Sequence, residues 1–190
     1  MSQLTEIRWH ARAGQGAVTA AKLVADTALL DDAYIQAMPE YGPERMGAPL
    51  KAYTRISPVP IEVHNNITNP SIVIVLDDTL LDTVDVLEGV PEDGVIILNT
   101  LMTPAEARAA LKAPATMRVA TVDATGIALA TIKKDMPNTP IVGALSAVTG
   151  LIPIENVKKR LVITFGKKFS QEMIDANLDC ADRAYKEVHE

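Results

Sequence analysis

Cysteine is almost absent from this sequence: Cys180 is the single one among 190 residues. One thiol cannot close an internal disulfide, and it cannot supply the four thiolates of an iron–sulfur cluster or the ligand set of a zinc finger. If the protein belongs to a redox system, we therefore expect other chains to hold the iron–sulfur clusters.

Aromatic residues and positive charge are also scarce. Aromatics make up 4% of the chain and the formal net charge is −6, which argues against stacking platforms or a general basic surface for nucleic acid. Apolar runs such as residues 71–76 are far shorter than the roughly 20 residues that cross a bilayer, and no signal peptide is visible. We expect a cytoplasmic protein that binds neither nucleic acid nor membrane, folded as one domain over residues 1–190.

What is present is an alternation of strand-like and helix-like segments. β-branched runs that end at a polar residue are typical of strands buried on both faces of a parallel sheet, and helix-sized segments separate them. The fold class predicted is α/β, with a single open, mostly parallel twisted sheet, helices on both faces and a helical C-terminal part. The predicted strands are 5–11, 34–38, 50–56, 71–76, 95–99 and 119–123, with 61–63 as a further short one. The predicted helices are 16–30, 79–87, 103–111, 125–133, 139–149, 155–165 and 170–188.

A glycine turn follows the first strand. Gly14 and Gly16 separate that strand from an Ala-rich helix, an arrangement that presents backbone N–H groups to an anion, and Arg12 stands directly before the turn. Arg8 and His10 alternate with Arg12, so all three should share one face of a regular strand. We interpret His10 as a structural, hydrogen-bonded residue, because no nearby Ser or Cys nucleophile needs a base.

The turn alone leaves its ligand open. A dinucleotide fingerprint has glycine or alanine at the third position, where this chain has Thr19, so binding of NAD or FAD by a free-standing enzyme or sensor remains a weaker alternative. A tight strand-to-helix turn without any ligand is a second alternative.

A second loop, residues 39–49 (PEYGPERMGAP), is rich in proline and glycine and follows another strand. Ligands of open α/β sheets collect beyond the carboxyl ends of the strands, so both loops should open on the same edge. Tyr41, Glu44, Arg45 and Gly47 are candidates for contacts with a ligand or with another subunit, and composition does not separate these two uses.

Two further patterns have structural interpretations. The seven carboxylates of residues 77–93 lack His partners and metal-ligand spacing, so we interpret them as exposed helix faces and strand-end caps and predict no metal site. Asn138 or Thr139 is predicted to cap the helix that follows, with Pro140 in its first turn.

Three motifs together resemble those of a known family. Residues 12–17 (RAGQGA), 39–49 and 138–144 (NTPIVGA), with 166–169 (GKKF) and 174–177 (IDAN), resemble the gamma subunits of 2-oxoacid:ferredoxin oxidoreductases, above all of pyruvate:ferredoxin oxidoreductases, the pyruvate synthases. The resemblance covers essentially the whole chain. Met46 departs from it, since many relatives have a small or basic residue there.

The resemblance implies an assembly of alpha, beta, gamma and delta subunits. Such an assembly converts pyruvate, coenzyme A and oxidised ferredoxin to acetyl-CoA, carbon dioxide and reduced ferredoxin. Thiamine diphosphate and Mg would lie on the alpha and beta subunits, and [4Fe-4S] clusters on the beta and delta subunits. The gamma chain would cover the active site and help to bind coenzyme A.

The same resemblance supplies candidate residues. Gly14, Gln15 and Gly16 would contact phosphates through their backbone, with Arg12 nearby. Tyr41, Glu44, Arg45 and Gly47 would contact coenzyme A or the alpha subunit. No catalytic residue is assigned. A gamma subunit for a related 2-oxoacid such as 2-oxoisovalerate, a free-standing dinucleotide-binding protein and a purely structural subunit remain the alternatives.

Overall fold

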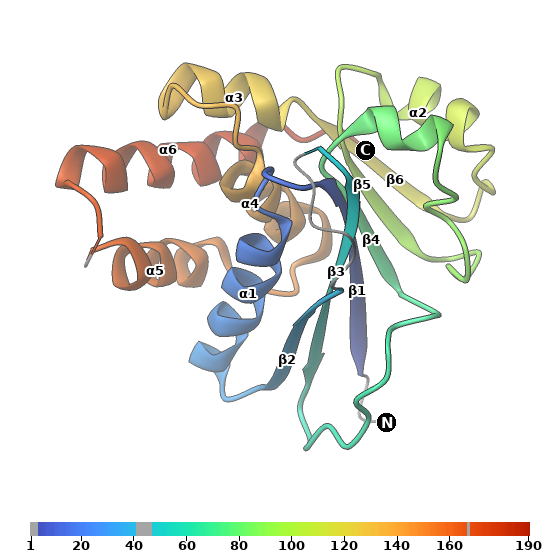
Figure 1. Ribbon diagram of the computed structural model, residues 1–190, viewed down its shortest axis with the longest axis horizontal. Coiled ribbons are helices and arrows are strands. Elements are labelled where there is room, and N and C mark those ends of the chain that lie inside the picture. Colours follow the sequence, from blue (N-terminus) through green and yellow to red (C-terminus); the bar gives the residue numbers. More distant parts are fainter. Residues whose placement is uncertain (1–3, 41–46, 167) are drawn as a thin grey trace.

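The structure, a computed structural model, describes residues 4–40, 47–166 and 168–190 (Figure 1). Within these ranges six strands form one sheet in the order β2-β3-β1-β4-β5-β6. Strands β1, β4, β5 and β6 run parallel, whereas β3 is antiparallel to both of its neighbours. The predicted open, mostly parallel sheet is therefore confirmed. The strands are β1 (Thr5–Arg12), β2 (Tyr34–Pro39), β3 (Pro49–Ser57), β4 (Ile72–Val75), β5 (Val95–Asn99) and β6 (Arg118–Val122).

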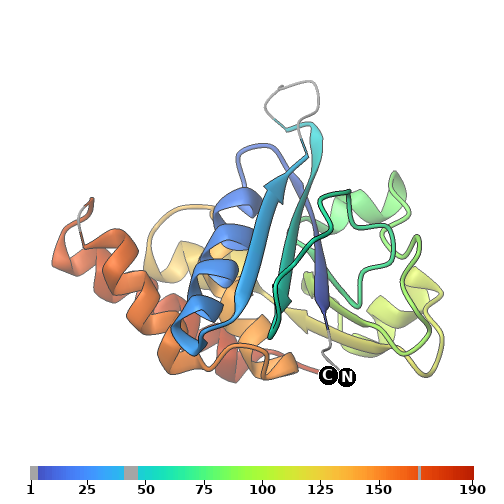
Figure 2. The same ribbon diagram turned by 90° about the horizontal axis from the view of Figure 1, so that it is seen from below.

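Helices cover both faces of the sheet, as predicted. Helix α1 and the C-terminal helices lie on one side and α2 lies on the other (Figures 1 and 2). In the part of the chain described, no helix is both long and apolar enough to cross a membrane. The helices are α1 (Ala17–Ala28), α2 (Pro104–Leu111), α3 (Ala124–Thr131), α4 (Asn138–Thr149), α5 (Ile154–Phe165) and α6 (Gln171–Glu187).

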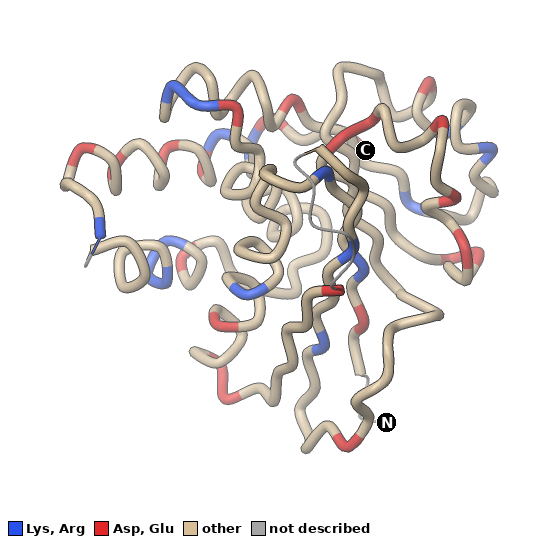
Figure 3. Tube along the Cα trace, viewed as in Figure 1, with Lys and Arg blue, Asp and Glu red and all other residues tan. Residues whose placement is uncertain are grey.

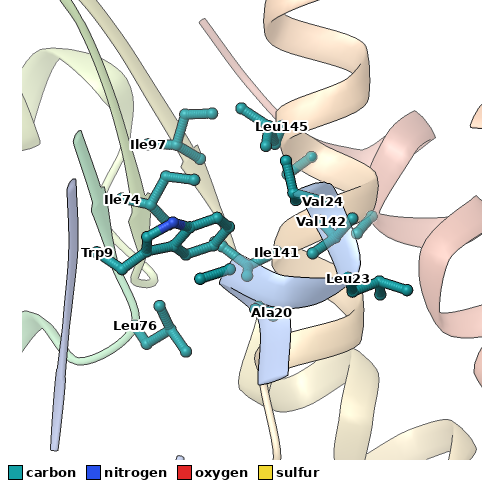
Figure 4. Packing of buried hydrophobic residues seen from close by; sticks show 14 of the residues in the cluster. Trp9, Ala20, Leu23, Val24, Ile74, Leu76, Ile97, Ile141, Val142 and Leu145 are labelled. Carbon is teal, nitrogen blue, oxygen red and sulfur yellow. The ribbon is translucent and has the colours of Figure 1, made fainter. Parts of the chain in front are cut away.

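Strand β1 lies inside the sheet, between β3 and β4. Its alternating residues Ile7, Trp9 and Ala11 are fully buried in the core under α1 and α4. Figure 4 shows Trp9 between residues of the neighbouring strands and those of α1 and α4. The indole N–H of Trp9 donates to Thr54 Oγ1 at 3.0 Å, so its one polar atom is satisfied within the core.

Two predicted elements are wrong. Residues 79–87 do not form an α-helix: a short 3-10 turn at Asp78–Asp82 is followed by further turns. The Asp85 carboxylate accepts a hydrogen bond from the Leu87 N–H, and such side-chain bonds compete with helix formation.

Residues 61–63 do not form a strand. The Val63 carbonyl accepts hydrogen bonds from the side chains of Gln36 and Arg55, in place of the backbone N–H of a neighbouring strand. Side chains of β2 and β3 thus hold this segment in place, and residues 61–63 form no backbone ladder with a neighbouring strand.

Candidate functional site

The glycine turn connects β1 to α1 in a conformation that only glycine adopts readily. Gly14 and Gly16 have φ angles of 106° and 81°, and Gly16 is the N-cap of α1. No side chain caps this helix end and no acidic residue lies in its first turn. The helix therefore presents unsatisfied N–H groups and partial positive charge, which are the elements of an anion site.

Gln15 holds the turn together. Its side-chain oxygen accepts a hydrogen bond from the Arg12 backbone N–H at 2.8 Å, and its own backbone N–H donates to the Arg12 carbonyl at 3.1 Å. The amide nitrogen of the same side chain donates to Asp77 Oδ2 at 2.7 Å. The predicted phosphate contact of Gln15 stays a prediction. Its side chain and its backbone N–H are both engaged within the turn, so a phosphate there would share a donor that already has an acceptor.

The Arg12 side chain spans the gap between the turn and the end of β4. Its Nε and Nη2 donate to Thr79 Oγ1 at 3.1 and 2.8 Å, and its Nη1 donates to the Gly47 carbonyl at 3.1 Å. Its Nε also lies 3.4 Å from Asp77 Oδ2. A guanidinium has five N–H donors. When the bonds to described residues are counted, one N–H on each terminal nitrogen of Arg12 is left for a further acceptor.

Asp77 stays ionised beside Arg12. Partial burial works to raise the pKa of this carboxyl, but hydrogen bonds from Thr79 and Gln15, together with the charge of Arg12, outweigh burial and hold the pKa below its ordinary value. Asp77 also caps the 3-10 turn through the Thr79 N–H, and Asp123 caps α3 through the Gly126 N–H. For Asp77, the prediction that carboxylates of residues 77–93 act as strand-end caps is confirmed.

The two predicted loops meet at one edge of the sheet. The Gly47 N–H donates to the Ala13 carbonyl at 3.2 Å, and the Ala13 N–H donates to the Ala48 carbonyl at 2.9 Å. The glycine turn and the end of the second loop thus lie at the same edge, as predicted, and these hydrogen bonds join them into one surface. The other candidates from that loop, Tyr41, Glu44 and Arg45, lie outside the described residues.

The prediction that Arg8 and His10 share a face is confirmed, and so is the structural interpretation of His10. Both side chains are buried, and Arg8 Nε donates to His10 Nε2 at 3.0 Å. Burial, reinforced by the nearby charges of Arg8 and Lys51, lowers the pKa of His10 to about 3. His10 is thus neutral near pH 7 and accepts a hydrogen bond as a fixed part of the scaffold.

Because His10 folds in its neutral form, acid should destabilise the protein. In the unfolded chain His10 binds a proton near its ordinary pKa of about 6.5, so its contribution is complete above that pH and is lost as pH falls from about 6.5 toward 3. The loss is at most about 1.4 kcal/mol per pH unit. We expect His10→Gln, which keeps an acceptor for Arg8, to show a shallower decline in urea unfolding free energy over this interval. Equal slopes for the two proteins would contradict the assignment.

The predicted capping role of Asn138 or Thr139 is wrong. Pro137 is the N-cap of α4 and no side chain caps this end. The Thr139 hydroxyl instead donates to Asn177 Oδ1 on α6 at 3.1 Å, because α6 packs directly across α4. Asn138 faces Gly16 instead: a Cβ added at Gly16 would lie 2.9 Å from Asn138 Nδ2. The only sequence signal for this meeting is that both residues belong to the motifs carrying the family resemblance.

Other polar groups at this edge are engaged with one another. A cavity of about 310 Å³ at the carboxyl ends of β4, β5 and β6 is lined by Asp77, Asp78 and Asp123 with several amides and hydroxyls. Within the described ranges no three His, Cys, Asp or Glu side chains are grouped so that they could hold a metal ion. Cys180 is buried, and burial raises the pKa of its thiol, which suits packing better than reactivity.

Comparison with protein families identifies one that spans nearly the whole chain. The family model described as pyruvate ferredoxin/flavodoxin oxidoreductase matches residues 6–187. The sequence is 48% identical over 183 residues to the pyruvate synthase subunit PorC of Thermotoga maritima, covering 96% of this chain and 94% of that one. It is 44% identical over 185 residues to the pyruvate/ketoisovalerate oxidoreductases common subunit gamma of Pyrococcus abyssi, covering 97% of each chain.

A solved structure has the same architecture. The crystal structure of the pyruvate oxidoreductase subunit PORC from Thermotoga maritima superposes with a TM-score of 0.85 at 43% sequence identity. The match covers 98% of this chain and 97% of that one. The sheet and its surrounding helices are thus shared over the full length of the described structure.

Proposed function

We propose a function from one premise: this chain belongs to the pyruvate ferredoxin/flavodoxin oxidoreductase family, as a gamma-type subunit of such an oxidoreductase. On that premise, the chain serves the pyruvate reaction by covering the active site and helping to bind coenzyme A. The overall reaction converts pyruvate, coenzyme A and oxidised ferredoxin to acetyl-CoA, carbon dioxide and reduced ferredoxin. We propose that its active site is completed by other subunits, and we assign no catalytic residue to it.

The observation that carries the coenzyme A proposal is the uncapped start of α1. Gly16 caps the helix with a φ of 81°, and no acidic residue lies in the first turn, so the first-turn N–H groups of α1 can donate hydrogen bonds to a diphosphate. Arg12 adds a guanidinium held by Thr79 and the Gly47 carbonyl, with donors to spare. Gly14, Gln15, Gly16 and Arg12 are therefore proposed as phosphate contacts, the first three through their backbone, with the Gln15 N–H shared with the Arg12 carbonyl.

The covering role is supported by the joined loops. Hydrogen bonds between Ala13 and the backbone of Gly47 and Ala48 make one continuous edge from two segments distant in sequence. We propose that this edge faces the alpha subunit and the bound coenzyme A, and that Gly47, with Tyr41, Glu44 and Arg45 of the same loop, contributes contacts there. The beta and delta subunits are proposed as the other members of the complex.

The electron-carrying cofactors are assigned to those other subunits. The full chain has one cysteine, so it does not fit a [4Fe-4S] cluster, which takes four thiolates. We likewise propose that thiamine diphosphate and its Mg lie on the alpha and beta subunits. The role proposed for this chain is to bind and orient coenzyme A and to enclose the active site.

Pyruvate is proposed as the substrate, with 2-oxoisovalerate as the alternative. The Thermotoga relative is named for pyruvate, whereas the Pyrococcus relative is named as a subunit common to the pyruvate and ketoisovalerate enzymes. A gamma subunit that serves both enzymes cannot be what distinguishes the two acids, so substrate choice is assigned to the other subunits.

Replacing Arg12 by Gln should weaken the use of coenzyme A. Loss of one charge-assisted phosphate contact costs about 1.5–3 kcal/mol, which is roughly a 10- to 150-fold rise in the KM for coenzyme A. The KM for pyruvate should stay unchanged, because the substitution lies at the coenzyme A edge. Steady-state kinetics of the assembled oxidoreductase measure both constants.

Arg118→Gln is the matched control, because Arg118 begins β6 and pairs with Glu190 at the other end of the sheet. It should leave both KM values unchanged. An intact Arg12→Gln complex with an unaltered KM for coenzyme A would refute the phosphate role and leave a purely structural subunit.

A further inference from the structure

The two outer strands of the sheet differ in how the chain covers them. Strand β6 forms one edge, and His189 near the end of the chain bonds to it: Thr121 and His189 exchange two backbone hydrogen bonds of 2.9 Å. Strand β2 forms the other edge, and Figure 2 shows it as the front strand of the sheet. We name the outward side of Tyr34–Pro39 the β2 edge.

The register with β3 identifies the backbone groups that β2 directs outward. The Glu40 N–H donates to the Lys51 carbonyl at 3.0 Å, and the antiparallel pairing continues from there back to Tyr34. Bonded positions alternate along an antiparallel strand, so Ile35 and Ala37 direct their N–H and C=O groups away from β3. No hydrogen bond joins these four groups to another element within the described ranges. Such an unpaired edge is a template for an added strand.

The composition of β2 does not block strand addition. Natural edge strands are commonly protected by charged side chains, prolines or bulges. Residues 34–38 (YIQAM) have neither charge nor proline, and their pairing with β3 is unbroken. Pro39 lacks an N–H, so it sets the C-terminal limit of the pairing. At the other end Tyr34 is 48% exposed, and Leu29 and Leu30 just before the strand are 47% and 41% exposed. An uncharged, partly apolar segment therefore suits this edge.

Acidic side chains lie at both ends of the β2 edge. Asp31 and Asp32 precede the strand and Glu40 follows it. Figure 3 shows β2 in tan between red segments at its two ends. Asp32 and Glu40 are exposed, and neither forms an ion pair with a described residue. Charge complementarity thus favours a partner segment with Lys or Arg on both flanks.

Pairing with a second copy of this chain would set like charges against each other. The two-fold arrangement that satisfies all four outward groups is centred on Gln36, with Ile35 opposite Ala37 of the other copy. The same register places Asp32 opposite Glu40 at both ends of the pair. Like charges directly opposite one another destabilise a strand pair. A different chain with basic flanks therefore fits the edge better than a second copy.

We propose that the β2 edge accepts an extended segment of another subunit of the oxidoreductase as an added strand. The segment is uncharged in its middle, where it bonds to the backbone of Ile35 and Ala37, and carries Lys or Arg at each end, where it meets Asp32 and Glu40. This contact is additional to the one proposed for the joined loops at the carboxyl ends of the strands.

Hydrogen exchange of individual amides tests the pairing directly. In the isolated full chain the Ile35 and Ala37 amides should exchange freely, whereas in the assembled oxidoreductase they should exchange at least tenfold more slowly. The Gln36 and Met38 amides, which bond to β3, should be protected in both and serve as internal controls. Equal exchange of Ile35 and Ala37 in the two states would overturn the inference. So would protection in the isolated chain that is lost on dilution, because a second copy would then occupy the edge.

Ala37→Pro tests the same contact by association. Proline removes the outward N–H and places its ring where the added strand would lie, but it takes no bond from β3. The Kd of the chain for the remaining subunits should rise about tenfold or more, measured by titration into the complex that lacks it. Ala37→Val is the matched control, because it keeps the N–H and should leave the Kd unchanged. The same Kd for both variants would overturn the inference.

Asp32→Asn tests the charged flank without altering the strand. Asp32 has a φ of 57°, which asparagine also adopts readily. The substitution should raise the Kd severalfold at low salt and less at high salt, whereas Asp93→Asn, exposed before β5, should not. An unchanged or lower Kd for Asp32→Asn would overturn the basic flank. The coenzyme A proposal is tested separately, because Arg12→Gln should change the KM for coenzyme A without changing the exchange of the Ile35 and Ala37 amides.

Discussion

Trp9→Ala should lower the free energy of unfolding of the full chain by about 3–5 kcal/mol, measured by urea denaturation. The side chain is fully buried, between Ile74 of β4 and Leu76 just after that strand on one side and the helices α1 and α4 on the other (Figure 4). Truncation removes the largest apolar side chain of this layer and leaves a cavity that rigid strands and helices cannot close.

A graded control separates the effect of the ring's volume on stability from the effect of its hydrogen bond. Trp9→Phe keeps much of the volume and loses the hydrogen bond to Thr54, so it should cost less than half as much as Trp9→Ala. Leu101→Ala should change stability by no more than about 0.5 kcal/mol, because Leu101 is 84% exposed. If Trp9→Ala cost no more than Leu101→Ala, the core would not be organised around β1.

Gly143→Ala should destabilise the protein by about 3 kcal/mol or more. A Cβ added at Gly143 would lie 2.2 Å from the Ala181 carbonyl oxygen and 3.0 Å from its Cα, so two helix backbones would have to separate. Gly143 lies in the middle of α4, where α6 crosses it closely. Helix propensity alone would favour alanine, so the sign of the effect reports the close approach of the two helices.

Gly150→Ala is the matched control. Gly150 has a φ of 63° but open space around its Cα, so alanine there pays only the backbone cost of about 1–2 kcal/mol. A loss for Gly143→Ala no larger than that for Gly150→Ala, in the same urea titration, would contradict the tight α4–α6 contact.

Most of the secondary structure could be predicted from local patterns. The runs before Asp77 and Asp123 are short and rich in β-branched residues, which is typical of a buried parallel strand. The prediction for residues 79–87 is wrong because their apolar spacing fits a helix, whereas the Asp85 side chain takes up the Leu87 N–H, which a helix would use.

The glycine turn of the candidate site could be predicted from the sequence, whereas the side-chain contacts around it could not. Gly14 and Gly16 stand out because a positive φ and a close approach leave few other residues possible. That Arg12 would be held by Thr79 and Gly47 depends on segments 67 and 35 residues away, and no local pattern reports such pairs. The same holds for Asn138, for which the local pattern of polar residue, threonine and proline indicates a cap.

The sequence by itself determined the α/β class, the six strands of the sheet, the anion-ready turn and, through its single cysteine, the exclusion of an iron–sulfur cluster from this chain. These follow from side-chain periodicity, glycine stereochemistry and ligand counting, which are all local or compositional. Only the tertiary structure decided the place of β3 between β2 and β1, the engagement of Gln15 and Arg12 with Asp77, and the meeting of Asn138 with Gly16. Each of these depends on which distant surfaces pack together, and packing is a property of the whole core rather than of any one segment.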